Sequence, residues 1–122
     1  MGTVAGIVGH EATEDNGEFV GEDSWDVMPS WTGSESFERP PVVMHSINGV
    51  FAIRSGKWKL IEGLGSGGFT APARIEPQEN GPMGQLYDLS IDPGETNNLY
   101  STSPEVVDRL SVMLNRIKES GR

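Results

Sequence analysis

The fold is decided by residues 41–61, whose sequence is PVVMHSINGVFAIRSGKWKLI. Three apolar runs suited to strands follow one another in this stretch, at 41–47, 50–54 and 57–61. Asn48-Gly49 separates the first two runs and is a strong hairpin signal, because a type I′ turn needs positive φ at both central residues. Ser55-Gly56 separates the second run from the third. The stretch therefore predicts a three-stranded antiparallel meander.

A long loop, a fourth strand and a helix complete the expected fold. Residues 62–83 are rich in Gly and Pro and predict a long irregular loop, and residues 85–89 predict a fourth strand. Ser103 as N-cap and Pro104 at the first position predict the start of a helix that Gly121 ends. The apolar stripe of this helix consists of Val106, Leu110, Met113, Leu114 and Ile117.

The predicted fold class is thus α+β. It comprises a small antiparallel sheet of about four strands with the C-terminal helix packed on one face. Long irregular loops and a flexible N-terminal leader complete it. We expect the leader to cover residues 1–21 and the folded domain to cover 22–122.

The N-terminal residues are acidic. Residues 3–8 are apolar and predict the last turns of a helix, whereas 9–21 are polar, and no Lys or Arg precedes Arg39. Such a charge is typical of a solvated leader, and also of an acidic strip that docks on a basic partner. Residues 23–28 predict a helical turn capped by Asp23 or Ser24, with Trp25 and Met28 packed inward.

The composition and the net charge disfavour or exclude several kinds of function and site. The 122 residues carry a formal net charge of -9, which disfavours binding to nucleic acid because a phosphate backbone would be repelled. The chain has no Cys, which excludes disulfides, thiolate metal sites and a Cys nucleophile within it. Its apolar runs are too short to span a bilayer.

Two motifs invite a functional interpretation. Residues 63–68 match G-x-G-x-x-G, but Pro72 disfavours the helix that a nucleotide site needs at this point, so the motif indicates a loop. His45 and His10 are the only histidines, and two histidines this far apart, without a nearby cluster of carboxylates, make a weak metal site. His45 is therefore either a packed structural residue or a substrate contact.

Oxygen-bearing and aromatic side chains give further candidates. A turn explains the residues from 92 onward, with Asn97 or Asn98 stapling the chain before the helix, and calcium ligation is the alternative. The oxygen ligands would be Asp92, Glu95, Asn97 and Asn98. Among the aromatic residues, Phe69 is the candidate ligand contact because it lies in the Gly-rich loop.

Several stretches together resemble the C-terminal subdomain of the type I sulfatases, the formylglycine-dependent family that includes arylsulfatases. Residues 21–29, GEDSWDVMP, resemble its G-E-D-S-hydrophobic segment. Residues 45–60 resemble its hairpin with Ile-Arg-x-Gly-Lys-Trp-Lys, and 65–69 resemble the loop beyond it. Residues 85–99 resemble its L-Y-D-L…D-P-x-E…N-L signature, so the resemblance covers residues 21–120.

The resemblance implies a large upstream catalytic domain as the partner of this chain. In that domain a Cys or Ser of the pattern [CS]-x-P-[ST]-R becomes formylglycine, and a calcium ion and basic side chains hold the sulfate. None of these groups carries over to this chain, so we expect no catalytic residue, metal site or cofactor within it. Residues 70–74, TAPAR, are rejected because Thr70 and Ala73 break the pattern.

The resemblance also implies a sulfated carbohydrate or an aryl sulfate as the substrate of the full-length enzyme, and a periplasmic or secreted location. Because the subdomain helps to shape the pocket around the rest of the substrate, His45, Phe69 and Arg74 are the substrate-lining candidates. The chain alone is expected to be inactive. Two other functions stay open: a stand-alone carbohydrate- or partner-binding module, and a purely structural domain.

Overall fold

The computed structural model describes residues 2–9, 25–33 and 39–120. The chain divides into two compact units, Met1–Glu38 and Arg39–Arg122, and each is described by itself. The predicted boundary between residues 21 and 22 lies outside the described residues and stays a prediction.

The first unit contains two short helices, α1 (Gly2–Ile7) and α2 (Met28–Thr32). Thr3 of α1 bonds to the segment that precedes α2. Its Oγ1 accepts from Val27 N at 3.0 Å and donates to Trp25 O at 3.2 Å. The helical expectation for residues 3–8 is thus confirmed in position, with α1 ending at Ile7.

The turn predicted at residues 23–28 is wrong in its details. Helix α2 begins at Met28, its N-cap is Val27 without a side-chain capping bond, and Asp23 and Ser24 lie outside the described residues. Trp25 is 48% exposed and is not packed inward. The physical reason is Pro29, which suits the first turn of a helix and places the start after Trp25.

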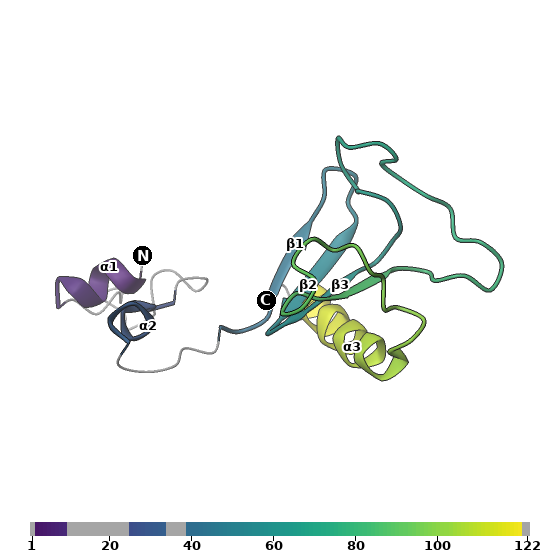
Figure 1. The fold of residues 1–122 in the computed structure, drawn as a ribbon. Coiled ribbons are helices and arrows are strands. Elements are labelled where there is room, and N and C mark those ends of the chain that lie inside the picture. The colour runs from purple at the N-terminus through teal and green to yellow at the C-terminus, as the bar shows by residue number, and fades with distance from the viewer. Residues whose placement is uncertain (1, 10–24, 34–38, 121–122) are drawn as a thin grey trace. The chain divides into compact units, whose positions relative to one another are not determined.

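The second unit is a four-stranded antiparallel sheet with a helix on one face (Figure 1). The strands follow the chain order as a meander: β1 (Val42–His45), β2 (Phe51–Ser55), β3 (Trp58–Ile61) and β4 (Gln85–Asp88). Helix α3 (Pro104–Ser120) follows. The predicted α+β class, the four strands and the packed C-terminal helix are confirmed.

The hairpin between β1 and β2 has a different turn from the predicted one. Ser46 N donates to Val50 O at 2.9 Å, so the loop has three residues, 47–49. Gly49 has a φ of 74°, whereas Asn48 does not have positive φ, and the predicted type I′ turn is wrong. The three-residue loop sets Val43 opposite Ile53. A two-residue turn would have shifted this register by one residue, and the apolar pairing would be lost.

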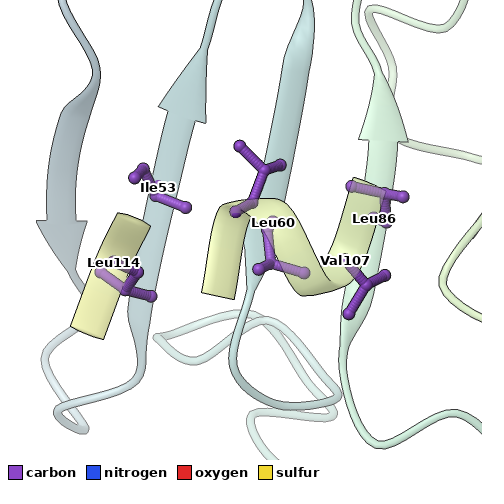
Figure 2. Close-up of a cluster of buried hydrophobic side chains, with 6 residues drawn as sticks. Ile53, Leu60, Leu86, Val107 and Leu114 are labelled. Atoms are coloured by element: carbon purple, nitrogen blue, oxygen red, sulfur yellow. The ribbon is translucent and has the colours of Figure 1, made fainter. Parts of the chain in front are cut away.

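One row of apolar side chains crosses the whole sheet. The register pairs Val43 with Ile53, Ile53 with Leu60, and Leu60 with Leu86, so all four lie on the same face. Ile53, Leu60 and Leu86 are fully buried. Figure 2 shows Ile53, Leu60 and Leu86 of this row together with Val107 and Leu114 of α3.

Helix α3 supplies the other half of the core. It begins at Pro104 as predicted, and its buried side chains are Val107, Leu110 and Leu114. The predicted stripe omitted Val107, which precedes Leu110 by three positions and so shares its face. Gly121 lies outside the described residues. In the described ranges, no helix combines the length and hydropathy that crossing a membrane requires.

The outer edge of β4 is covered by the segment before α3. Leu99 N donates to Leu86 O at 2.8 Å, like a residue of a further strand. The Asn98 amide completes the cover, because Oδ1 accepts from Leu86 N and Nδ2 donates to Gly84 O, each at 3.0 Å. Of the two asparagines expected to staple the chain, Asn98 does so.

A buried carboxylate fixes the end of β4. Asp88 accepts from Lys57 Nζ at 2.6 Å and also from the backbone N and the hydroxyl of Ser90. The hydrogen bond from Lys57, followed by that from Ser90, lowers the pKa of Asp88 below its ordinary value of 3.8. The ionised form is therefore the one that the fold stabilises.

This pKa predicts a specific acid dependence of stability. Because the folded pKa is depressed, the contribution of Asp88 is present above pH 3.8 and is lost as the pH falls through the lower folded value. Urea unfolding from neutral to acidic pH should show a weaker acid loss in the Asp88→Asn variant than in the wild type. Asp108→Asn, on the exposed side of α3, is the control. Parallel acid profiles for wild type and Asp88→Asn would contradict the assignment.

Candidate functional site

The long connection between β3 and β4 forms a lobe with its own hydrogen bonds, which we call the 64–75 lobe. Leu64 and Ile75 form an isolated antiparallel bridge at its base. Farther out, Ser66 N donates to Pro72 O at 3.0 Å and Gly67 N donates to Ala73 O at 2.8 Å. The predicted long loop is therefore present, and this part of it is folded back on itself (Figure 1).

The 64–75 lobe lies against the turn of the β1–β2 hairpin. A Cβ added to Gly67 would stand 3.0 Å from both Cβ and Oγ of Ser46. Just before the lobe, a Cβ on Gly63 would stand 3.3 Å from Val50 Cγ1. These contacts bring the lobe to the residue next to His45. We call His45, Ser46 and the 64–75 lobe the tip site.

The base of the lobe is held by one side chain of β4. Gln85 Nε2 donates to Gly63 O at 2.8 Å and to Gly65 O at 3.0 Å. Its other amide atom, Oε1, accepts from the Tyr87 hydroxyl at 2.7 Å. Burial, then the carboxylates of Glu95 and Asp92, raises the pKa of Tyr87. The phenol therefore stays protonated and keeps donating to Gln85.

His45, the first substrate-lining candidate, is at the end of β1 and is exposed. Its Nδ1 lies 3.0 Å from Ser46 O, and its ring centroid lies 5.8 Å from that of Phe51, its cross-strand partner. One ring nitrogen is thus engaged locally, and the Phe51 ring lies tilted beside the imidazole. The rest of the imidazole is available to solvent or to a ligand.

Phe69 and Arg74, the other two candidates, are both in the 64–75 lobe. The Phe69 side chain is 93% exposed. Arg74 Nε lies 3.0 Å from Glu76 Oε1, and because both side chains are exposed this ion pair contributes little to stability. The three candidates, all within the described ranges, make no hydrogen bond, ion pair or ring contact with one another. The fold brings together their backbone segments, not their side chains.

The oxygen-bearing side chains of Asp92 and Glu95, after β4, have partners within the chain. The Asp92 carboxylate accepts from the backbone N atoms of Thr96 and Asn97. These bonds lower the pKa of Asp92. Glu95 lies 2.6 Å from Lys59 Nζ. The turn interpretation therefore accounts for these groups.

Within the described part of the chain, no three His, Asp or Glu side chains form a group that could hold a metal ion. His10 lies outside that part. Residues 63–68, which match G-x-G-x-x-G, lie almost entirely within the 64–75 lobe. The next helix along the chain is α3, so the motif does not open a helix. The side chains of His45, Phe69 and Arg74 in the tip site are exposed.

The sequence interpretation missed the part that Ser46 plays in the tip site, and the part that Gln85 and Tyr87 of β4 play at the base of the lobe. Alternation along β4 places Gln85 and Tyr87 on the face opposite Leu86, and this much is readable from the sequence. Which carbonyl groups the amide meets depends on the path of the long loop, for which the sequence carries no periodic signal.

No protein-family model matches the chain. It is 35% identical over 101 residues to an N-acetylgalactosamine-6-O-sulfatase of Bacteroides thetaiotaomicron, which covers 83% of this chain and 20% of that protein. It is 30% identical over 87 residues to arylsulfatase K of Mus musculus, which covers 66% of this chain and 13% of that protein. The chain therefore spans one fifth or less of the curated relatives that it matches.

This chain is also similar to a solved structure. This structure is described in connection with the metabolism of multiple glycosaminoglycans by Bacteroides thetaiotaomicron. The similarity has a TM-score of 0.63 at 29% sequence identity, and it covers 96% of this chain and 23% of that one. The sequence and the fold of this chain are thus similar to a limited part of much longer proteins.

Proposed function

Because this chain corresponds to the C-terminal region of a sulfatase, we propose that the whole protein hydrolyses sulfate esters of a carbohydrate. The observation that carries the proposal is the 35% identity over 101 residues to an N-acetylgalactosamine-6-O-sulfatase. A sulfated amino sugar is accordingly the first substrate to test, and aryl sulfates are the second. A stand-alone binding module is not favoured, because both curated relatives are sulfatases of which this chain matches only a part.

The chemistry of sulfate hydrolysis is proposed to reside outside this chain. The sequence contains no Cys, and its TAPAR segment at 70–74 lacks the residues that become formylglycine in the resembled family. The described residues also do not provide a metal-binding group. Calcium and formylglycine would therefore belong to an upstream catalytic domain, on which this chain packs as its partner. A periplasmic or secreted location is part of the same proposal.

The contribution of this chain is proposed to be the tip site. His45 and the 64–75 lobe would flank the leaving group, which is the sugar that remains after sulfate is removed. The imidazole of His45 offers a hydrogen-bonding group, Phe69 offers an exposed ring, and Arg74 offers a charge for an acidic neighbouring sugar. This arrangement supports discrimination among sugars and not the cleavage step.

One kinetic experiment on the full-length protein tests the proposal. We expect sulfate release from 6-O-sulfated N-acetylgalactosamine and from a small aryl sulfate. His45→Ala should change the ratio of kcat/KM between the sugar and the aryl sulfate by about tenfold, the effect of one lost polar contact to a substrate. Arg116→Ala, on the exposed side of α3, is the control. The tip-site role fails if His45→Ala leaves the ratio unchanged, and the proposed function fails if no sulfate is released from either substrate.

A further inference from the structure

We infer that Gln85 and Gly67 are positioning residues for Phe69, and that the Phe69 ring packs on the face of a sugar unit adjoining the sulfated one. The inference rests on the proposed function and deepens it, because it names the substrate as an oligosaccharide. It assigns a role to two residues that do not themselves touch the substrate.

Phe69 has an exposed ring on a restrained backbone. Its predecessor, Gly68, donates its N–H to Ser66 Oγ at 3.2 Å, and its successor, Thr70, accepts at its carbonyl from the same hydroxyl. The ring is nevertheless 93% exposed. The ring is therefore accessible to a ligand, and covering it would remove apolar area from water. The C–H face of a pyranose is apolar, and an aromatic ring can cover it while the hydroxyl groups at its edge stay solvated.

The restraint on the lobe comes from Gln85. The Tyr87 hydroxyl fixes the amide by donating to Oε1, so that both Nε2 hydrogens point at loop carbonyls, those of Gly63 and Gly65. Gln85 belongs to β4, beside the fully buried Leu86. The base of the long connection between β3 and β4, residues 62–84, is thereby tied to a strand of the core.

Gly67 restrains the other side of the lobe. It has a φ of 66°, and the space for a Cβ is already filled by Ser46. A side chain at this position would both strain the backbone and push the lobe away from the hairpin turn. Its neighbour Gly68 is different, because a Cβ there would meet only Ser66 O, at 3.9 Å.

The restraint itself can be measured on this chain by amide hydrogen exchange. Gln85→Glu keeps the shape of the side chain but removes both donors and places a carboxylate oxygen beside two carbonyls. We expect the Ser66 and Gly67 amides to exchange at least about tenfold faster in this variant, while amides of α3 keep their rates. Gln78→Glu adds the same charge at an exposed position and is the matched control. Unchanged exchange at Ser66 and Gly67 would overturn the role of Gln85.

The functional consequence is measured on the full-length protein with a sulfated oligosaccharide and a small aryl sulfate. Gln85→Glu and Gly67→Ala should each raise the ratio of the saccharide KM to the aryl sulfate KM by about tenfold, with Gln78→Glu and Gly68→Ala as matched controls. Phe69→Ala should give the same shift, and adding Gln85→Glu to it should give no more. An equal loss of kcat on both substrates would show that these residues only maintain the fold, and would overturn the inference. If the wild type releases no sulfate at all, the proposed function fails, and the exchange measurement still decides whether Gln85 holds the lobe.

Discussion

Replacing Leu110 with Asp is expected to unfold the second unit completely. Leu110 is fully buried, and it belongs to the core cluster that α3 forms with the apolar row of the sheet. Leu→Ala changes at such positions cost about 2–5 kcal/mol, and a carboxylate adds the penalty of burying a charge without a partner. Since whole domains are stable by only about 5–15 kcal/mol, the aspartate variant should have no folded baseline. Circular dichroism during heating and urea titration measures this directly.

The same helix provides the control for that experiment. Val112 is 70% exposed and two residues away, so Val112→Asp should melt close to the wild-type temperature. Leu110→Ala should unfold cooperatively at a lower urea concentration, between these two variants. A cooperative, unshifted transition for Leu110→Asp would show that α3 does not pack on the sheet as described.

The elements that the sequence could predict are those specified by local patterns. The hairpins of the meander follow from alternation and from Gly in the turns, and α3 follows from Pro104 and its apolar stripe. The turn type at Asn48-Gly49 could not be predicted from the dipeptide alone. It is set by the partner strand, because pairing Val43 with Ile53 contributes more than the intrinsic preference of two loop residues.

The candidate site was predictable only in part, for a related reason. The exposure of Phe69 follows from its Gly-rich surroundings. The resemblance to sulfatases makes His45 a substrate-lining candidate. The bonds from Gln85 to Gly63 and Gly65 join residues 20 and 22 positions apart across an irregular segment. No periodicity or turn motif encodes such contacts, so they appear only once the path of the lobe is known.

The largest effect expected away from the apolar core is at Asn98. Its side chain pairs with Leu86 N, Gly84 O and Tyr100 N, each at 3.0 Å. Asn98→Leu would leave these three backbone groups without their side-chain partner, at about 1–3 kcal/mol for each one that water does not reach. We therefore expect the free energy of unfolding to fall by about 3 kcal/mol or more, with the loss measured as a lower urea midpoint.

Asn97→Leu separates this cause from the general effect of placing an apolar residue in the segment. Asn97 is exposed, and its backbone N, which donates to Asp92 Oδ2, is kept in the variant. Its urea midpoint should therefore stay near that of the wild type. Asn98→Asp adds a finer distinction, because it keeps acceptors for Leu86 N and Tyr100 N but sets a carboxylate against Gly84 O. It should lose stability on account of that one contact. Equal midpoints for the two leucine variants would mean that Leu99 N alone holds the segment on β4, and that the Asn98 amide contributes nothing to its edge.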